Sequence, residues 1–140
     1  MNQDSPSVSL DILVIKGDKI LLGLLNENWL YQNEQVYGVP GRNLKLNETI
    51  GDDAKRYIQQ ELGCNITSYK IISINANYAL NNHYLGIGVL AEIDGEPKLP
   101  LQGDWIKWEW FDKNDLPNNL FPPARNVIES YINNKINVSE

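Results

Sequence analysis

Two residue types that build compact sites in many small proteins are almost missing from this chain of 140 residues. A single cysteine, Cys64, excludes an internal disulfide framework and suits a reducing compartment, so we expect a cytoplasmic protein. A single histidine, His83, excludes zinc sites built on several histidines, such as the His-Glu-x-x-His motif. Any metal bound here must therefore rely mainly on oxygen ligands.

Basic residues and long apolar runs are also scarce. Twelve Lys and Arg residues stand against eighteen Asp and Glu residues, which gives a formal net charge of −6. Nucleic-acid backbones and anionic membrane surfaces both attract basic proteins, so this balance argues against either partner. The longest apolar stretches, 10–15 and 20–25, are too short to span a bilayer, and residues 1–9 lack the basic start and apolar core of a signal peptide.

The remaining composition, 42% apolar and 21% charged residues, is typical of a soluble globular protein. We expect one domain over residues 1–140, with loose ends at 1–6 and 135–140. Runs or alternations of apolar residues predict six strands, and Asn81-Asn82 is expected to form the turn between the two longest. The strands are expected over 7–15, 19–25, 36–39, 66–80, 83–93 and 106–111.

Two helices are predicted between and after these strands. Thr49 is a suitable N-cap, and apolar residues at four-residue intervals follow it until Gly63, a suitable C-cap. These apolar residues are Ile50, Ala54, Ile58 and Leu62. A second helix is expected over 123–134. Strands interrupted by one central helix and closed by another predict an α/β sandwich.

Residues 39–64, VPGRNLKLNETIGDDAKRYIQQELGC, place a Pro-Gly turn, a loop and a capped helix in succession. This segment resembles the Nudix box, whose pattern is Gly, five residues, Glu, seven residues, Arg-Glu-apolar-x-Glu-Glu-x-Gly-apolar. The matching positions are Glu48, Arg56, Ile58, Glu61, Gly63 and Cys64, with Pro40-Gly41 ahead of them. The resemblance implies a Nudix-type α/β/α sandwich with a mixed sheet, a central helix carrying the box over 41–64, and a C-terminal helix.

Three positions depart from that pattern. Arg42 replaces the first Gly, Tyr57 replaces the Glu after the Arg, and Gln60 replaces the first Glu of the pair. Tyr57, Gln60 and Glu61 share one helix face because they lie three and four residues apart. In the family, this face presents carboxylates to divalent cations that bridge a substrate diphosphate, which implies Mg²⁺ or Mn²⁺ as the cofactor. One of the three carboxylates is kept here.

The chain is also similar to a subset of the family, the GDP-mannose mannosyl hydrolases, which lack the same two glutamates. The similar segments are Val8-Ser9-Leu10-Asp11, Leu21-Leu22-Gly23, His83-Tyr84 and the late aromatic strand. In that subset the remaining Glu, a carbonyl of the Pro-Gly turn and a loop side chain hold one metal, and a loop histidine is the base. Gly103 falls about where that histidine would be, so Asp104 is the first candidate for the base and Glu96 the second.

The resemblance also implies roles for the candidate residues. The candidate catalytic residues are Glu61, Asp104 and Arg56. The candidate metal ligands are Glu61, the carbonyl of Gly41, Gln60 and Gln102. The candidate substrate-binding residues are Asp11, Arg42, Tyr37 and His83, whereas Glu48, paired with Arg56, and Gly63 give structural support. Structural alternatives stay open: Arg42 as a solvated loop charge, Asp11 as a strand-edge carboxylate, Tyr37 as a core residue and His83 as a hydrogen-bonded strand residue.

We therefore expect a divalent-metal-dependent hydrolase of a nucleoside diphosphate linked to another moiety. The substrate is either a nucleotide sugar or a nucleotide pyrophosphate, because the segment from residue 95 to 111 also resembles nucleotide pyrophosphatases of the same family. The alternative is a Nudix-fold module that binds nucleotides or metabolites with little or no catalysis. A protein-interaction domain is a third hypothesis, and a homodimer stays open.

Overall fold

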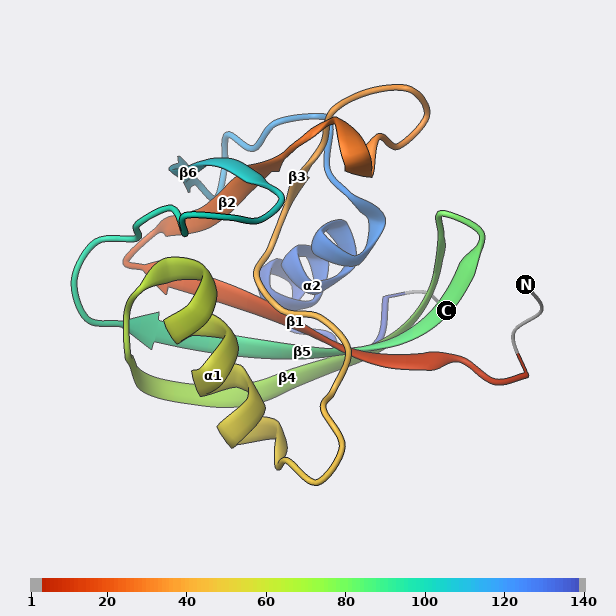
Figure 1. Ribbon diagram of the computed structural model, residues 1–140, viewed down its shortest axis with the longest axis horizontal. Coiled ribbons are helices and arrows are strands. Elements are labelled where there is room, and N and C mark those ends of the chain that lie inside the picture. The colour runs from red at the N-terminus through yellow and green to blue at the C-terminus, as the bar shows by residue number, and fades with distance from the viewer. Residues whose placement is uncertain (1–3, 139–140) are drawn as a thin grey trace.

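The computed structural model describes residues 4–138 of the chain (Figure 1). Within them, the sequence forms six strands, one short 3-10 helix and two α-helices, in the order expected. The elements are β1 (Ser7–Lys16), β2 (Lys19–Leu25), η1 (Glu27–Trp29), β3 (Tyr37–Gly38), α1 (Ile50–Leu62), β4 (Ile66–Ala79), β5 (Asn82–Ile93), β6 (Trp105–Asp112) and α2 (Pro122–Asn133). No helix within this described part is long and apolar enough to cross a membrane.

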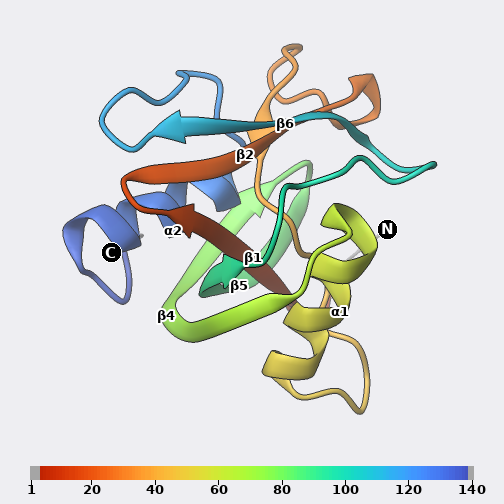
Figure 2. The same ribbon diagram turned by 90° about the vertical axis from the view of Figure 1, so that its left-hand side faces the viewer.

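The strands form a mixed sheet in the order β3-β2-β1-β5-β4, with β6 paired to the other edge of β2. The β1–β5 pair is parallel, and the other pairs are antiparallel. Because β1 and β2 pair only beside their hairpin, at Ile15↔Ile20 and Lys16↔Lys19, the two strands diverge away from it. Figure 2 shows the result, with β2 and β6 lying across the layer formed by β1, β5 and β4.

The two helices cover opposite faces of the β1-β5-β4 layer, as the two core clusters show. Alternate β1 residues Leu10, Ile12 and Val14 pack with Ala54, Ile58 and Leu62 of α1. Leu13, between them, faces the other way and packs in a second cluster with residues of α2 such as Val127 and Ile128. The period of two in the strand and of about four in α1 thus produces the expected α/β/α sandwich with a mixed sheet.

The caps of α1 are those that the sequence predicts. The Thr49 hydroxyl accepts a hydrogen bond from the Asp52 N–H at 3.1 Å, and Gly63 takes the left-handed conformation with φ of 69°. These two caps fix where the helix begins and ends. They therefore also fix which turn carries Glu61.

The turn between β4 and β5 differs from the prediction by one residue. Its central residues are Leu80 and Asn81, with φ of 52° and 62°, and Asn82 already pairs with Ala79. Two consecutive positive φ values are typical of the tight turn that best suits a twisted hairpin. Ala79 is buried, and its place on the inner face of β4 sets this register, so the prediction of Asn81-Asn82 was wrong.

The free edge of β4 contacts the last described residues of the chain. The Ile74 N–H donates to the Ile136 carbonyl, and the Val138 N–H donates to Asn75 Oδ1, both at 2.8 Å. Of the end segments expected to be loose, residues 1–3 and 139–140 lie outside the described part. Residues 136–138 lie along β4.

Candidate functional site

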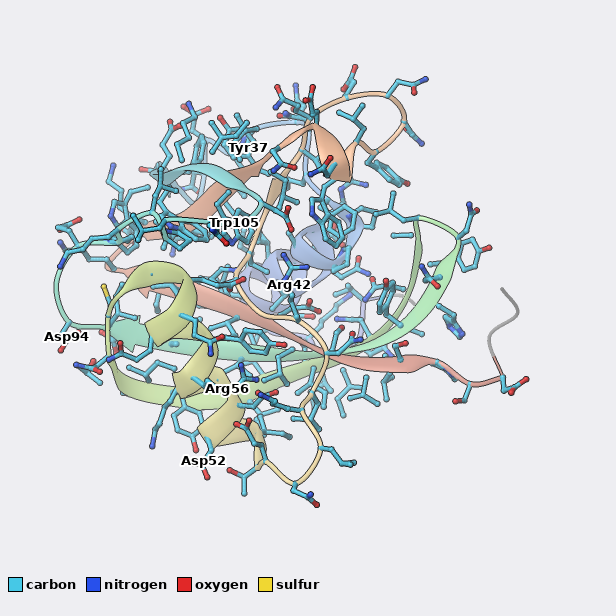
Figure 3. The ribbon with its side chains drawn as sticks, viewed as in Figure 1. Tyr37, Arg42, Asp52, Arg56, Asp94 and Trp105 are labelled. Carbon is cyan, nitrogen blue, oxygen red and sulfur yellow. The ribbon has the colours of Figure 1, made fainter. Side chains whose placement is uncertain are left out.

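A cavity of about 340 Å³ opens where β1, the loop after β3, η1 and the start of β6 meet. Its lining includes Asp11 of β1, Gly41 and Arg42 of the loop, Trp29 of η1 and Trp105 of β6. Three residues that the sequence analysis selected, Asp11, Gly41 and Arg42, are thus brought together. In Figure 3 the labelled side chains of Arg42 and Trp105 lie near the middle of the molecule, between α1 and the β2–β6 layer.

Glu61, in the last turn of α1, points at the loop that lines this cavity. Its Oε2 accepts the backbone N–H of Gly41 at 3.1 Å, and its Oε1 accepts the Trp105 indole N–H at 3.4 Å. Its side chain is only 13% exposed, and this burial raises the pKa of the carboxyl, although the Gly41 N–H lowers it. Both oxygens of the remaining box carboxylate therefore have protein partners.

The Pro-Gly turn needs glycine at position 41 for two reasons. Gly41 has a φ of 115°, which favours glycine, and a Cβ built on it would overlap the backbone oxygen of Leu10. The loop lies this close because the Leu10 N–H donates to the Arg42 carbonyl and the Ile12 N–H to the Pro40 carbonyl, both at 2.9 Å. The loop is therefore attached to β1 on one side and to Glu61 on the other.

Arg42 connects two acidic residues that lie far apart in the sequence. Its Nη2 lies 2.8 Å from Asp104 Oδ2, and its Nε lies 3.9 Å from Glu61 Oε1. Its guanidinium carbon also lies 5.0 Å from the centre of the Trp29 ring. Hydrogen bonds from Trp29 and Arg42 hold the pKa of Asp104 below its ordinary value, although burial raises it. Asp104 is therefore a carboxylate at neutral pH.

Trp105 reaches Glu61 because Gly23 of β2 leaves room for it. A Cβ at Gly23 would overlap the rings of Trp105 and Trp108. The two rings stack at a centroid distance of 4.4 Å with a tilt of 38°. The Leu-Leu-Gly segment singled out in the sequence thus supports the site through packing, which the sequence alone did not indicate.

The box helix is held to its loop by a group of charges that includes one residue sequence reasoning missed. Arg56 Nε pairs with Glu48 Oε1 at 3.0 Å, as expected. Arg56 also pairs with Asp53, a fully buried carboxylate that accepts the Lys45 N–H at 3.1 Å as well. The sequence did not single out Asp53, because acidic residues are common in the first turn of a helix, where they interact favourably with the helix dipole.

The two non-acidic residues of the box face have other partners. Arg56 Nη1 donates to Gln60 Oε1 at 3.1 Å, and the Tyr57 hydroxyl donates to the Asn43 carbonyl at 2.9 Å. Tyr57 also lines the cavity. The helix face that carries three carboxylates in the Nudix pattern therefore carries one here, Glu61. Of the other two residues, Tyr57 contacts the loop and Gln60 contacts Arg56.

Asp11 lies in the cavity lining, and burial raises its pKa to about 7. A Cβ at Gly86 of β5 would overlap Asp11 Oδ2 and would lie 3.1 Å from Asn77 Nδ2. Gly86 therefore gives the carboxyl its space, and the sequence held no signal for that. A carboxyl with such a pKa is present in both protonation states near neutral pH.

The other predicted residues lie elsewhere. Tyr37 packs edge-on against Phe111 at 5.2 Å, beside the α2 cluster, and is not among the residues that line this cavity. His83 lies at an exposed position of β5, opposite Tyr78. Gln102 is exposed in the loop before β6. Glu96 pairs with Lys16 at 3.2 Å, around a second cavity.

A hard divalent cation needs several oxygen donors, and the site offers a small set. Glu61 and Asp104 already share one positive group, Arg42, and the Gly41 backbone lies beside Glu61. No group of three or more His, Cys, Asp or Glu side chains close enough to hold a metal occurs within residues 4–138. Glu61 and Asp104 are therefore candidate donors for a single cation, and two carboxylates are too few for a multi-metal cluster.

No protein-family model matches this chain. Among solved structures, a MutT Nudix hydrolase from Burkholderia pseudomallei is 22% identical, with 90% of this chain and 98% of that chain covered and a TM-score of 0.78. An ADP-ribose pyrophosphatase from Streptococcus suis is 16% identical, with 88% and 85% covered and a TM-score of 0.68. A UDP-X diphosphatase is 12% identical, with 98% and 68% covered and a TM-score of 0.72. The chain therefore has the fold of the Nudix hydrolases.

Proposed function

We propose that the protein hydrolyses a nucleoside diphosphate linked to another moiety, with one Mg²⁺ or Mn²⁺ ion as cofactor. Two of the similar structures are named for such compounds, ADP-ribose pyrophosphatase and UDP-X diphosphatase. Both names describe a nucleoside and a second group joined through a diphosphate. The residue similarities to GDP-mannose mannosyl hydrolases favour a nucleotide sugar within this class.

The observation that carries the proposal is the convergence of Glu61, Arg42 and Asp104 around the Gly41 loop, at the edge of a cavity of ligand size. A diphosphate is anionic, and the chain as a whole is acidic. A cation must therefore stand between the substrate and the carboxylates. Glu61, Asp104 and the Gly41 carbonyl are the groups that would hold it.

When bound, the metal supplies positive charge that stabilises the charge developing on the phosphates. The chain's own residues orient the substrate. Arg42 is placed to bind a phosphate oxygen, and the rings of Trp29 and Trp105 offer flat surfaces for a nucleobase. Asp11 can donate or accept a hydrogen bond at a polar base edge, since its pKa is about 7.

A second candidate is a module that binds nucleotides with little or no catalysis. The observation that favours it is that two carboxylates of the box face are replaced. Gln60 accepts a hydrogen bond from Arg56 instead, and Tyr57 donates one to the loop. Asp104, with its lowered pKa, is also a weak proton acceptor.

The test is a panel of hydrolysis assays, each run with Mg²⁺ or Mn²⁺ and again with EDTA. The substrates are GDP-mannose and other nucleotide sugars, ADP-ribose, and nucleoside triphosphates. We expect metal-dependent turnover that is lost in Glu61→Gln and kept in Glu109→Gln, a β6 carboxylate paired with Lys107 outside the cavity lining. Equal turnover in Glu61→Gln would reject the assignment. No turnover, together with a higher melting temperature in the presence of a nucleotide, would favour the binding module.

A further inference from the structure

The guanidinium of Arg42 lies beside both carboxylates that would hold the proposed metal. The two carboxylates that fit a metal, Glu61 and Asp104, both face this one side chain, at 3.9 Å and 2.8 Å. Two carboxylates are thus paired with one cation that belongs to the chain.

Several contacts favour this position of Arg42. The planar group donates to Asp104 and lies against the Trp29 ring. The Asn26 N–H bonds the Asp104 carbonyl at 2.7 Å, so η1 and the loop before β6 are joined beside the guanidinium. Arg42 itself stands at the position where the Nudix pattern has Gly, a residue that could not supply such a charge.

A divalent ion held by Glu61 Oε1 and Asp104 Oδ2 would compete with this guanidinium for the same oxygens. A metal that took Glu61 and Asp104 would remove the partners of Arg42 and would lie within a few ångströms of a positive charge. The displaced side chain would then need a new anion, and the diphosphate of a bound nucleotide is of the right charge and geometry for a guanidinium fork.

We propose that Arg42 competes with the divalent cation for Glu61 and Asp104, and that metal binding releases Arg42 to the substrate diphosphate. This inference rests on the proposed function for the identity of the ligand. It makes metal and diphosphate binding mutually reinforcing, since each removes an obstacle to the other. Without a nucleotide, the metal binds weakly because it must first break the two ion pairs.

The experiment measures Mn²⁺ binding to the protein alone, by the loss of the free-ion electron paramagnetic resonance signal. We expect Arg42→Gln to bind Mn²⁺ about tenfold more tightly than the wild type, because one competing charge is gone. Arg42→Lys keeps the charge and should remain close to the wild type. Adding Glu61→Gln to Arg42→Gln should abolish the gain.

The matched control is Lys107→Gln, which removes one positive charge from an exposed ion pair on β6 outside the cavity lining. It should leave Mn²⁺ affinity unchanged, whereas a gain equal to that of Arg42→Gln would reduce the effect to net charge and overturn the proposal. Circular dichroism checks that each variant is folded. The proposal is also overturned if folded Arg42→Gln binds Mn²⁺ no more tightly than the wild type, or does not bind it.

The Mn²⁺ binding experiment and the hydrolysis assays test the two proposals separately. Turnover by the wild type with unchanged Mn²⁺ affinity in Arg42→Gln would keep the hydrolase and reject the competition. Tighter Mn²⁺ binding by Arg42→Gln without turnover in any protein would support the competition and reject the hydrolase.

Discussion

The backbone N–H of Gly41 donates a hydrogen bond to Glu61 Oε2 at 3.1 Å, which joins the Pro-Gly turn to the last turn of α1. We expect Gly41→Ala to break this link, because the added Cβ would overlap the Leu10 carbonyl oxygen at a φ that alanine avoids. The free energy of unfolding should fall by about 2 kcal/mol, and any turnover should fall with it. Urea unfolding measures the first quantity.

The control for this substitution is Gly95→Ala. Gly95 also has a positive φ, 73°, but a Cβ there meets nothing within 4 Å. Gly95→Ala should lower the free energy of unfolding by about 1 kcal/mol, because alanine disfavours this backbone conformation, and should leave the site intact. If Gly41→Ala costs no more than Gly95→Ala, the close approach to Leu10 does not constrain the loop.

Arg56 neutralises a carboxylate that has no access to water. Asp53 is fully buried, so Arg56→Met would leave its charge unpaired and should reduce the free energy of unfolding by about 3 kcal/mol. Glu48→Gln should cost less than about 1 kcal/mol, because its pair with Arg56 is partly exposed. Thermal unfolding followed by circular dichroism compares the two, and equal losses would contradict the ranking.

Asp11 should give the stability a distinct pH dependence. Burial raises its pKa in the folded chain from 3.8 to about 7, so between these values the folded state holds a proton that the unfolded state has released. Stability is therefore lost as the pH rises through this window, by about 1.4 kcal/mol per pH unit from this group, and is constant above it.

The variant Asp11→Asn replaces this titratable carboxyl with an amide that stays uncharged at every pH tested. It should match the wild type in urea unfolding at pH 4 and exceed it in stability at pH 8. The difference between the two proteins cancels the titration of all other groups. A difference that does not change between pH 4 and pH 8 would show that Asp11 has an ordinary pKa.

Leu80 holds a conformation that its side chain disfavours. Its φ is 52° at the first central position of the β4–β5 turn, where asparagine is preferred. Leu80→Asn should raise the free energy of unfolding by about 0.5 to 1 kcal/mol. The fully exposed Leu101 provides the control, because Leu101→Asn should leave the unfolding midpoint unchanged.

Sequence patterns predicted the fold well, for local physical reasons. The Thr49 and Gly63 caps and the four-residue apolar interval act within α1, so the sequence contains the information directly. The register of the β4–β5 turn was missed by one residue because it depends on Ala79 packing inward against another layer.

The site was harder to predict, because its contacts join distant segments. The Glu48–Arg56 pair, eight residues apart along a motif, was foreseen and is confirmed. The contact of Arg42 with Asp104 spans 62 residues, and nothing in either neighbourhood marks it. Gly23 and Gly86 matter for the space that they leave to side chains of other strands, which a single sequence does not reveal.

The contact of residues 136–138 with β4 bears on how the protein behaves in solution. An edge strand of 14 residues with exposed Ile71, Ile74 and Tyr78 is a template for strand addition between molecules. The Ile136 carbonyl and the Val138 N–H shield the middle of that edge. We therefore expect a chain shortened after Lys135 to leave this edge uncovered and to aggregate more readily than the full chain.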